Sequence, residues 1–188
     1  MTQEEQREVE AHEIETADDV AQAYDIVEKM FPGMDVAVAT PHVFDVYDDI
    51  LAVGSVDMLL EDLRQVRESA FVVFSTDQPT AEQVLGMFDR IYFVNGTYRR
   101  AKPGRLEERT EALVKAVAIA EKVFGDKSTI EGVFEVYDYL DVAKSEEDFA
   151  SDLKRTYKYA KKAFKTEAPT PGQVFGLFDK IFVVGGEE

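Results

Sequence analysis

Apolar residues recur at every third or fourth position along most of the chain, which is the spacing of one face of an α-helix. In the first half of the chain this pattern predicts four helices that begin near Thr16, Thr40, Ser55 and Thr80. Each of these residues has a side-chain oxygen that can cap a helix N-terminus. Thr80 and Gln83 have the spacing of a capping box. The hydrophobic pattern therefore predicts an all-α fold.

The same succession of predicted helices occurs twice. When the sequence is shifted by 90 residues, residues 43–96 align with 133–186 without a gap, and 21 of the 54 pairs are identical. VFDVYDDI aligns with VFEVYDYL, and the capping box at Thr80 aligns with one at Thr170. A match of this length predicts a tandem duplication of a four-helix unit, with about eight helices and a pseudo-two-fold relation between the copies.

The repeat divides the chain into four segments. Residues 1–15 form an acidic N-terminal arm that we expect to be flexible, and residues 16–96 form the first helical repeat. Residues 97–105 are a basic linker containing Pro-Gly, which breaks helices. Residues 106–188 form the second repeat.

The end of the first repeat has two interpretations. Asn95-Gly96 lies between β-forming residues, which is a hairpin signal. The aligned Gly185-Gly186 is followed only by Glu187 and Glu188, so the second copy offers no return strand. We therefore expect both pairs to be helix C-caps, and the apolar helices before them to be central.

Composition narrows the class of protein. Hydrophobic residues make up 45% of the chain and cysteine is absent, which indicates a globular core and excludes disulfides and thiol catalysis. The longest apolar run, residues 70–74, is far shorter than the roughly 18 residues of a membrane span, and no export signal is visible, so we expect a cytoplasmic protein. The acidity resembles that of proteins from salt-loving organisms.

The charge is unevenly distributed. The net charge is −17, but residues 1–96 contain 5 basic and 21 acidic residues, whereas residues 97–188 contain 16 and 17. The basic residues of the second half gather on its third predicted helix, within an arc of about 120° at about 100° per residue. These basic residues are Lys154, Arg155, Lys158, Lys161, Lys162 and Lys165.

This basic face has a functional and a structural interpretation. It could bind an anionic partner, together with Arg99 and Arg100 of the linker, or it could be a solvated face. The aligned positions of the first repeat include Phe71 and Val72, which lie outside the core stripe of their helix. We expect these two apolar side chains to be covered by the other repeat or by a partner.

Two carboxylates occupy otherwise apolar helices. Asp89 and Asp179 are aligned, and a carboxylate in such a place is either paired or functional. Tyr47 and Tyr137 are also shared by the repeats and could donate hydrogen bonds to them. We favour this structural role over a catalytic one.

Metal and cofactor sites are poorly supported. His42, Asp45 and Asp49 share a helical face, but the second repeat has Gly, Glu and Tyr at these positions, and acidic residues early in a helix favour its dipole. Phosphate-loop, calcium-loop and nucleophile-elbow motifs are absent. We expect no metal and no cofactor.

Three functions are compatible with these features. The first is a non-enzymatic interaction, adaptor or assembly protein that uses the diverged faces of its repeats on a protein partner or a second copy of itself. The second is nucleic-acid binding through the basic face, which the overall negative charge opposes. The third is an enzyme that uses carboxylates such as Asp89 and Asp179.

Overall fold

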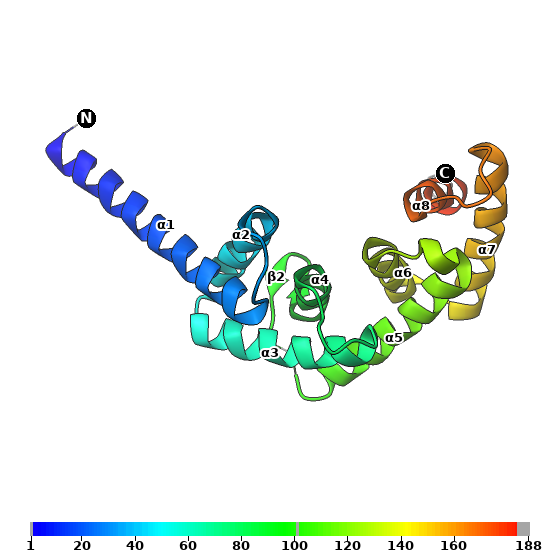
Figure 1. Cartoon of the computed structure of the whole chain (residues 1–188), viewed down its shortest axis with the longest axis horizontal. Coiled ribbons are helices and arrows are strands. Elements are labelled where there is room, and N and C mark those ends of the chain that lie inside the picture. The colour runs from blue at the N-terminus through cyan, green and yellow to red at the C-terminus, as the bar shows by residue number, and fades with distance from the viewer. Residues whose placement is uncertain (1, 101, 184–188) are drawn as a thin grey trace. The chain divides into compact units, whose positions relative to one another are not determined.

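The computed structural model describes residues 2–100 and 102–183, and helices dominate this part of the chain (Figure 1). The predicted all-α class is therefore confirmed. The contacts divide the chain into two compact units. Unit 1 contains residues up to Phe71 and residues 76–103, and unit 2 contains residues 72–75 and the chain from Gly104 onward. In the described residues, no helix is both long enough and apolar enough to span a membrane.

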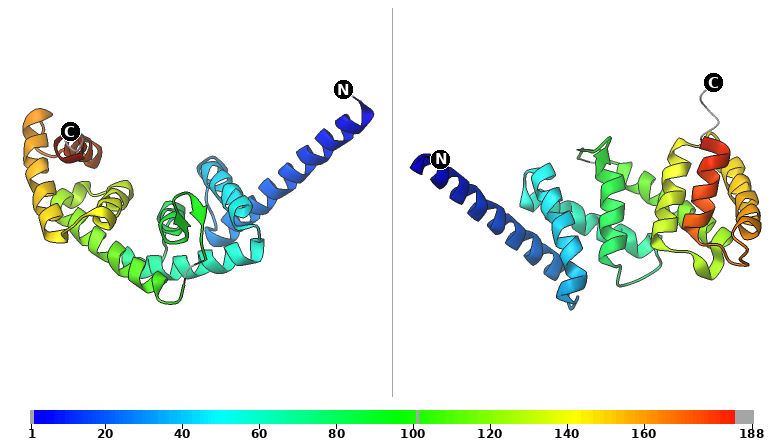
Figure 2. Two further views of the ribbon diagram at one scale, coloured as in Figure 1. Left: turned by 180° about the vertical axis from the view of Figure 1, so that it is seen from behind. Right: turned by 90° about the horizontal axis from the view of Figure 1, so that it is seen from above.

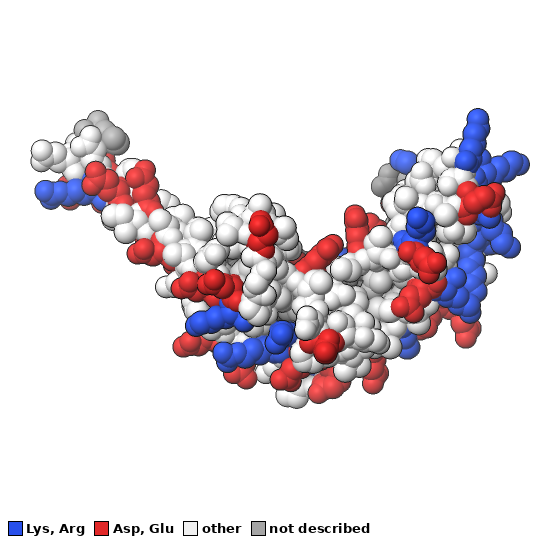
Figure 3. Space-filling view, in the orientation of Figure 1, with Lys and Arg blue, Asp and Glu red and all other residues white. Residues whose placement is uncertain are grey.

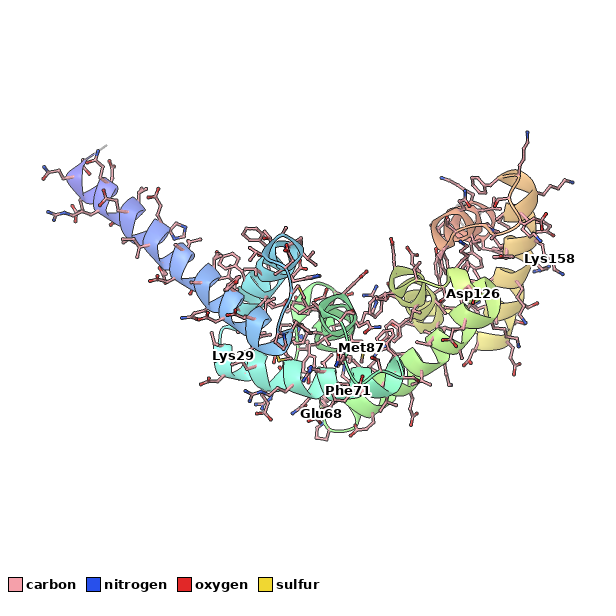
Figure 4. All side chains as sticks on the ribbon, viewed as in Figure 1. Lys29, Glu68, Phe71, Met87, Asp126 and Lys158 are labelled. Carbon is pink, nitrogen blue, oxygen red and sulfur yellow. The ribbon has the colours of Figure 1, made fainter. Side chains whose placement is uncertain are left out.

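Unit 1 contains four helices followed by a short hairpin. The helices are α1 (Gln3–Met30), α2 (Val36–Val53), α3 (Val56–Val73) and α4 (Ala81–Tyr92), and the strands are β1 (Phe93–Val94) and β2 (Thr97–Tyr98). The apolar helix α4 is the centre of this unit. Val84, Met87, Phe88 and Ile91 are completely buried, and Figure 4 shows Met87 among the packed side chains.

Unit 2 also has four α-helices. They are α5 (Arg105–Phe124), α6 (Ile130–Val142), α7 (Glu146–Ala163) and α8 (Pro171–Phe178), with a 3-10 turn at Gly125–Lys127 and a π-helical turn at Asp179–Val183. Figure 2 shows α6, α7 and α8 side by side. The Tyr139 ring stacks on Phe149 at 5.7 Å and on Phe175 at 5.6 Å, and Phe178 packs edge-on against Tyr139 at 5.1 Å. Aromatic rings therefore fill the centre of unit 2.

The capping boxes begin α4 and α8 as predicted. The Thr80 hydroxyl accepts a hydrogen bond from the backbone N–H of Gln83 at 3.2 Å, and the Gln83 side chain accepts one from the N–H of Thr80 at 2.9 Å. Thr170 and Gln173 repeat this pair of bonds, with Pro171 at the first helical position. These bonds satisfy N–H groups that have no partner inside the helix.

Two predicted helix starts are wrong. The helix α1 begins at Gln3 rather than Thr16, because Thr2 and Glu5 form a capping box of their own, and residues 3–15 are helical rather than an irregular arm. The helix α2 begins at Val36, where Asp35 accepts a hydrogen bond from the N–H of Ala37 at 2.9 Å. Pro41 therefore lies inside α2, where it removes one backbone hydrogen bond.

The structure has a β-hairpin at Asn95-Gly96, where we expected a helix C-cap. The strand β1 pairs with β2 in antiparallel register, and Asn95 and Gly96 both have positive φ, at 52° and 73°, as a tight primed turn requires. The hairpin places the Tyr98 hydroxyl 2.5 Å from a carboxylate oxygen of Asp62, a buried acid of α3, to which it donates a hydrogen bond. The Asn-Gly turn signal therefore predicts this segment correctly, and the prediction of a C-cap at Asn95-Gly96 is wrong. Gly185-Gly186 lies outside the described residues.

Candidate functional site

The basic face lies on the C-terminal half of α7. Residues 153–165 contain six basic residues and no acidic one; five of them lie on α7, and Lys165 lies just beyond its end at Ala163. Figure 3 shows blue side chains along this helix. Lys154, Lys158 and Lys161 follow each other at intervals of four and three residues, which places them on one line of the helix. In Figure 4, Lys158 points outward from α7. The apolar side of α7 is buried through Phe149, Leu153 and Ala160.

Few of these cations have an acidic partner. Arg155 bonds to Asp152 one turn earlier on α7, and Lys161 lies 2.7 Å from Glu167, whose side chain is 94% exposed. In the described part of the chain, no ion pair involves Lys154 or Lys158. Surface pairs such as that of Lys161 contribute little free energy. Most of the positive charge on this face is therefore free to meet an external anion.

A shallow apolar groove adjoins the basic face, between α5 and α7. It has a volume of about 290 Å³, and Ala118, Ile119, Val123 and Ala150 provide its apolar surface. Three lysines and two glutamates also line this groove. They are Lys115, Lys122, Lys154, Glu146 and Glu147.

The lysines of the groove include a like-charged pair. The ammonium group of Lys122 lies within hydrogen-bonding range of Lys154 and lowers the pKa of Lys154. Lys115 instead pairs with Glu146 at 3.3 Å. Two adjacent cations repel each other, and an anion placed between them would relieve that repulsion. The groove therefore combines an apolar surface with charges of both signs, and its two adjacent lysines, Lys122 and Lys154, are the part that an anion would bind.

The other residues predicted for the partner surface lie in different surroundings. Arg99 and Arg100 follow β2 in unit 1, and both are exposed. Phe71 is half-buried beneath the guanidinium group of Arg67, 5.5 Å from the ring centre. Val72 is 66% exposed, so the structure does not show the cover that we expected for it.

The tyrosine partners predicted for Asp89 and Asp179 are wrong in the described residues. The hydroxyl of Tyr139, not Tyr137, donates a hydrogen bond to Asp179. Tyr137 instead accepts a bond of 3.0 Å from Arg109. Tyr137 aligns with Tyr47 of the first repeat, whereas Tyr139 aligns with Asp49, so the comparison of the repeats does not point to Tyr139. Of the two predicted pairs, Tyr47 and Asp89 also form no hydrogen bond.

Asp49 is a buried acid that the sequence did not single out as such. It is only 7% exposed, and burial raises its pKa to about 8, with further contributions from the charges of Asp89, Asp45 and Asp48. Partial burial also raises the pKa of Asp89 to about 6, against the effect of the Arg90 charge. Asp49 is therefore mostly protonated at neutral pH.

A cavity in unit 1 is lined by an arginine that has one buried nitrogen without a hydrogen-bond partner. The cavity has a volume of about 560 Å³ and is lined by Arg67 among apolar residues such as Met30, Phe31 and Met34. The Nε atom of Arg67 is buried and has no hydrogen-bond partner in the structure. This unpaired donor has a desolvation cost that is not recovered.

The possible metal site of α2 is not assembled. His42 lies 3.8 Å from Asp45, but no group of three or more His, Cys, Asp or Glu side chains in the described residues is arranged to hold a metal ion. Neither Asp49 nor Asp89 lines the α5–α7 groove or the Arg67 cavity.

The charge and exposure of α7 make it the strongest candidate site in the described residues. No protein-family model, curated protein or solved structure matches the chain.

Proposed function

We propose that this chain is a non-enzymatic helical interaction or assembly protein, built from two copies of a four-helix unit, whose basic α7 binds an anionic partner. The observation that carries this proposal is the run of six cations in residues 153–165, of which five are exposed. Four of the six have no ion pair in the described residues, namely Lys154, Lys158, Lys162 and Lys165. The aligned residues of α3 include Glu68, Phe71 and Val72, so the repeats differ most in charge at this place.

The carboxylates give less support to an enzyme. Asp179 accepts a hydrogen bond from Tyr139, which is the role of a structural polar pair. Asp49 and Asp89 have raised pKa values, but neither carboxylate forms a side-chain hydrogen bond in the described residues that would mark a catalytic pair. Burial of Asp49 is enough to account for its shift.

Nucleic acid is the second candidate partner, because a line of lysines can follow a phosphate backbone. Its binding would fall steeply as salt is raised. The excess of 17 negative charges on the whole chain repels a polyanion at long range, whereas a short acidic protein segment is repelled less. We therefore place an acidic protein partner first.

The test is a fluorescence-anisotropy titration of the full chain with two labelled probes, a poly-glutamate peptide and a single-stranded oligonucleotide. The test variant is Lys154→Glu/Lys158→Glu/Lys161→Glu. The control, Lys29→Glu/Arg64→Glu/Lys102→Glu, changes the net charge equally at exposed positions outside α7.

We expect the wild type and the control to bind poly-glutamate, and the α7 variant to bind it at least about tenfold more weakly. If the chain binds the oligonucleotide but not poly-glutamate, the partner of α7 is a nucleic acid rather than an acidic protein. Binding of neither probe, or equal binding by the α7 variant, would contradict the proposal.

A further inference from the structure

The N-terminal half of α1 is an acidic helix without a packing surface. Residues 3–19 contain eight acidic residues and one arginine, and every residue from 3 to 15 is exposed. Figure 1 shows this part of α1 extending beyond α2, and Figure 3 shows red side chains along it. The apolar residues Val9 and Ile14 are 48% and 65% exposed. A polar helix of this length gains little stability by itself.

The acidic residues of α1 match the lysines of α7 in spacing. Glu4, Glu8 and Glu15 lie on one line of α1, separated by four and seven residues. The lysine line on α7 is formed by Lys154, Lys158 and Lys161, which cover seven residue steps, or about 10 Å at about 1.5 Å per residue. Glu8 and Glu15 are separated by the same seven steps. These two carboxylates can therefore face the two ends of the lysine line.

The apolar surfaces also correspond. Ile14 lies beside the acidic line of α1, about 100° from Glu15. The groove beside Lys154 offers Ile119 and Val123. An amphipathic helix that docks in a groove uses this combination of an apolar anchor and flanking charges.

We infer that the acidic part of α1, residues 3–19, docks along α7 and the α5–α7 groove of a second copy of this chain. The inference rests on the proposed function, because it names the anionic partner of α7. The second copy is favoured because the chain itself supplies an exposed acidic helix with the required spacing. Each copy has one acidic donor and one basic acceptor, so the contact is heterologous and produces chains or closed rings.

The affinity of a contact between α1 and α7 should depend on the salt concentration. Exposed ion pairs are screened when the Debye length falls from about 14 Å at about 50 mM salt to about 4 Å at about 500 mM. The association should therefore weaken at least about tenfold over that range. It should also depend on protein concentration, which separates it from any docking within one chain.

Sedimentation velocity of the full chain over a concentration series tests the inference. One variant reverses the acidic line, Glu4→Lys/Glu8→Lys/Glu15→Lys, and another reverses the basic line, Lys154→Glu/Lys158→Glu/Lys161→Glu. A control, Asp25→Lys/Glu28→Lys/Asp77→Lys, makes the same charge change as the acidic variant at other exposed positions of unit 1.

We expect the wild type and the control to associate at low salt, each line variant alone to remain monomeric, and an equimolar mixture of the two line variants to associate again. Association of the mixture requires the unchanged acidic line of one variant to contact the unchanged lysine line of the other. A variant that is misfolded would not restore association. Circular dichroism checks the helix content of each variant.

Two outcomes overturn the inference. One is a wild-type chain that is monomeric at every concentration and salt, and the other is association that both variants retain. If the chain is monomeric but α7 still binds poly-glutamate, only the second-copy partner is wrong. If α7 binds no anionic probe, the proposed function fails as well.

Discussion

The two units place different chemistry at aligned positions. In unit 2, Tyr139 of α6 stacks between aromatic rings and donates a hydrogen bond to Asp179. In unit 1, the aligned position in α2 is Asp49, which is buried beside the charge of Asp89. The same position of the sequence pattern therefore holds an aromatic ring in one unit and a buried acid in the other, although unit 1 has an aromatic cluster elsewhere, where Phe88 stacks on Tyr92.

A second pair of positions repeats this contrast. Tyr157 of α7 packs edge-on against Phe124 at 6.0 Å, whereas the aligned Arg67 of α3 lines a cavity with an unpaired Nε atom. Aromatic side chains stabilise unit 2 by burying large apolar surfaces. Unit 1 instead retains ionisable groups at a cost in stability. Substitutions at these positions test how far the contrast extends.

Asp49 should give the largest effect. Its pKa is raised from 3.8 to about 8 in the folded chain, so the folded state binds more protons than the unfolded state between these values. The free energy of unfolding should therefore fall as pH rises from about 4 to about 8. Asp49→Asn should raise that free energy at pH 7 by on the order of 2–4 kcal/mol and flatten its pH dependence.

Urea unfolding of the full chain at a series of pH values measures this effect. Asp25→Asn, at an exposed position of α1, is the control and should change stability little. Loss of stability in Asp49→Asn across the whole pH range would mean that the carboxylate makes a favourable interaction when charged.

The tyrosine of unit 2 should give the next effect. Tyr139→Phe keeps the ring and removes the hydroxyl that bonds to Asp179, so it should cost about 1–2 kcal/mol of unfolding free energy. Tyr159→Phe is the control, because Tyr159 is 55% exposed. Equal effects of the two substitutions would show that the bond contributes nothing to unit 2.

Two glycines of unit 2 should respond oppositely to the same substitution. A Cβ atom at Gly132 would lie 3.1 Å from the Pro171 ring, whereas one at Gly176 would meet nothing within 4 Å. Gly176→Ala should therefore stabilise the chain by about 0.5–1 kcal/mol, because alanine favours helix. Gly132→Ala should destabilise it by about 1 kcal/mol. Thermal unfolding of both variants would refute the close packing of Gly132 on Pro171 if both gained stability.

Arg67 should give the smallest effect. Arg67→Met keeps an unbranched apolar stem and removes the unpaired Nε atom, so stability should stay equal or rise by up to about 1 kcal/mol. Arg64→Met, on the exposed side of α3, is the control. A marked loss of stability in urea unfolding would show that Arg67 has a stabilising contact beyond its position over Phe71.

Local capping signals predicted part of this fold correctly. Thr80 and Thr170 begin helices because a side-chain oxygen and a returning glutamine satisfy the first backbone N–H groups. Thr2 and Glu5 carry the same signal, and it begins a helix where the acidic composition of residues 1–15 predicts a flexible arm. At Asn95-Gly96 the local turn signal predicts the hairpin correctly, whereas the comparison with the second repeat does not.

The partners of the polar residues could not be predicted in the same way. Tyr137 and Tyr139 are two positions apart, so they point about 160° away from each other on α6, and the orientation of the helix decides which one meets Asp179. The burial of Asp49 depends likewise on how α2 packs. The basic face of α7 was predicted because it needs only helical periodicity, and its exposure agrees with that pattern.

Hydrogen exchange of residues 3–15 at low salt is the most direct test of docking between copies, because protection of these exposed amides that increases with protein concentration requires a partner for the acidic helix. We expect protection of residues 3–15 to rise with protein concentration in the wild type and to stay low in Lys154→Glu/Lys158→Glu/Lys161→Glu. Exchange of these amides at a rate that is independent of concentration, or protection that the α7 variant retains, would contradict this docking.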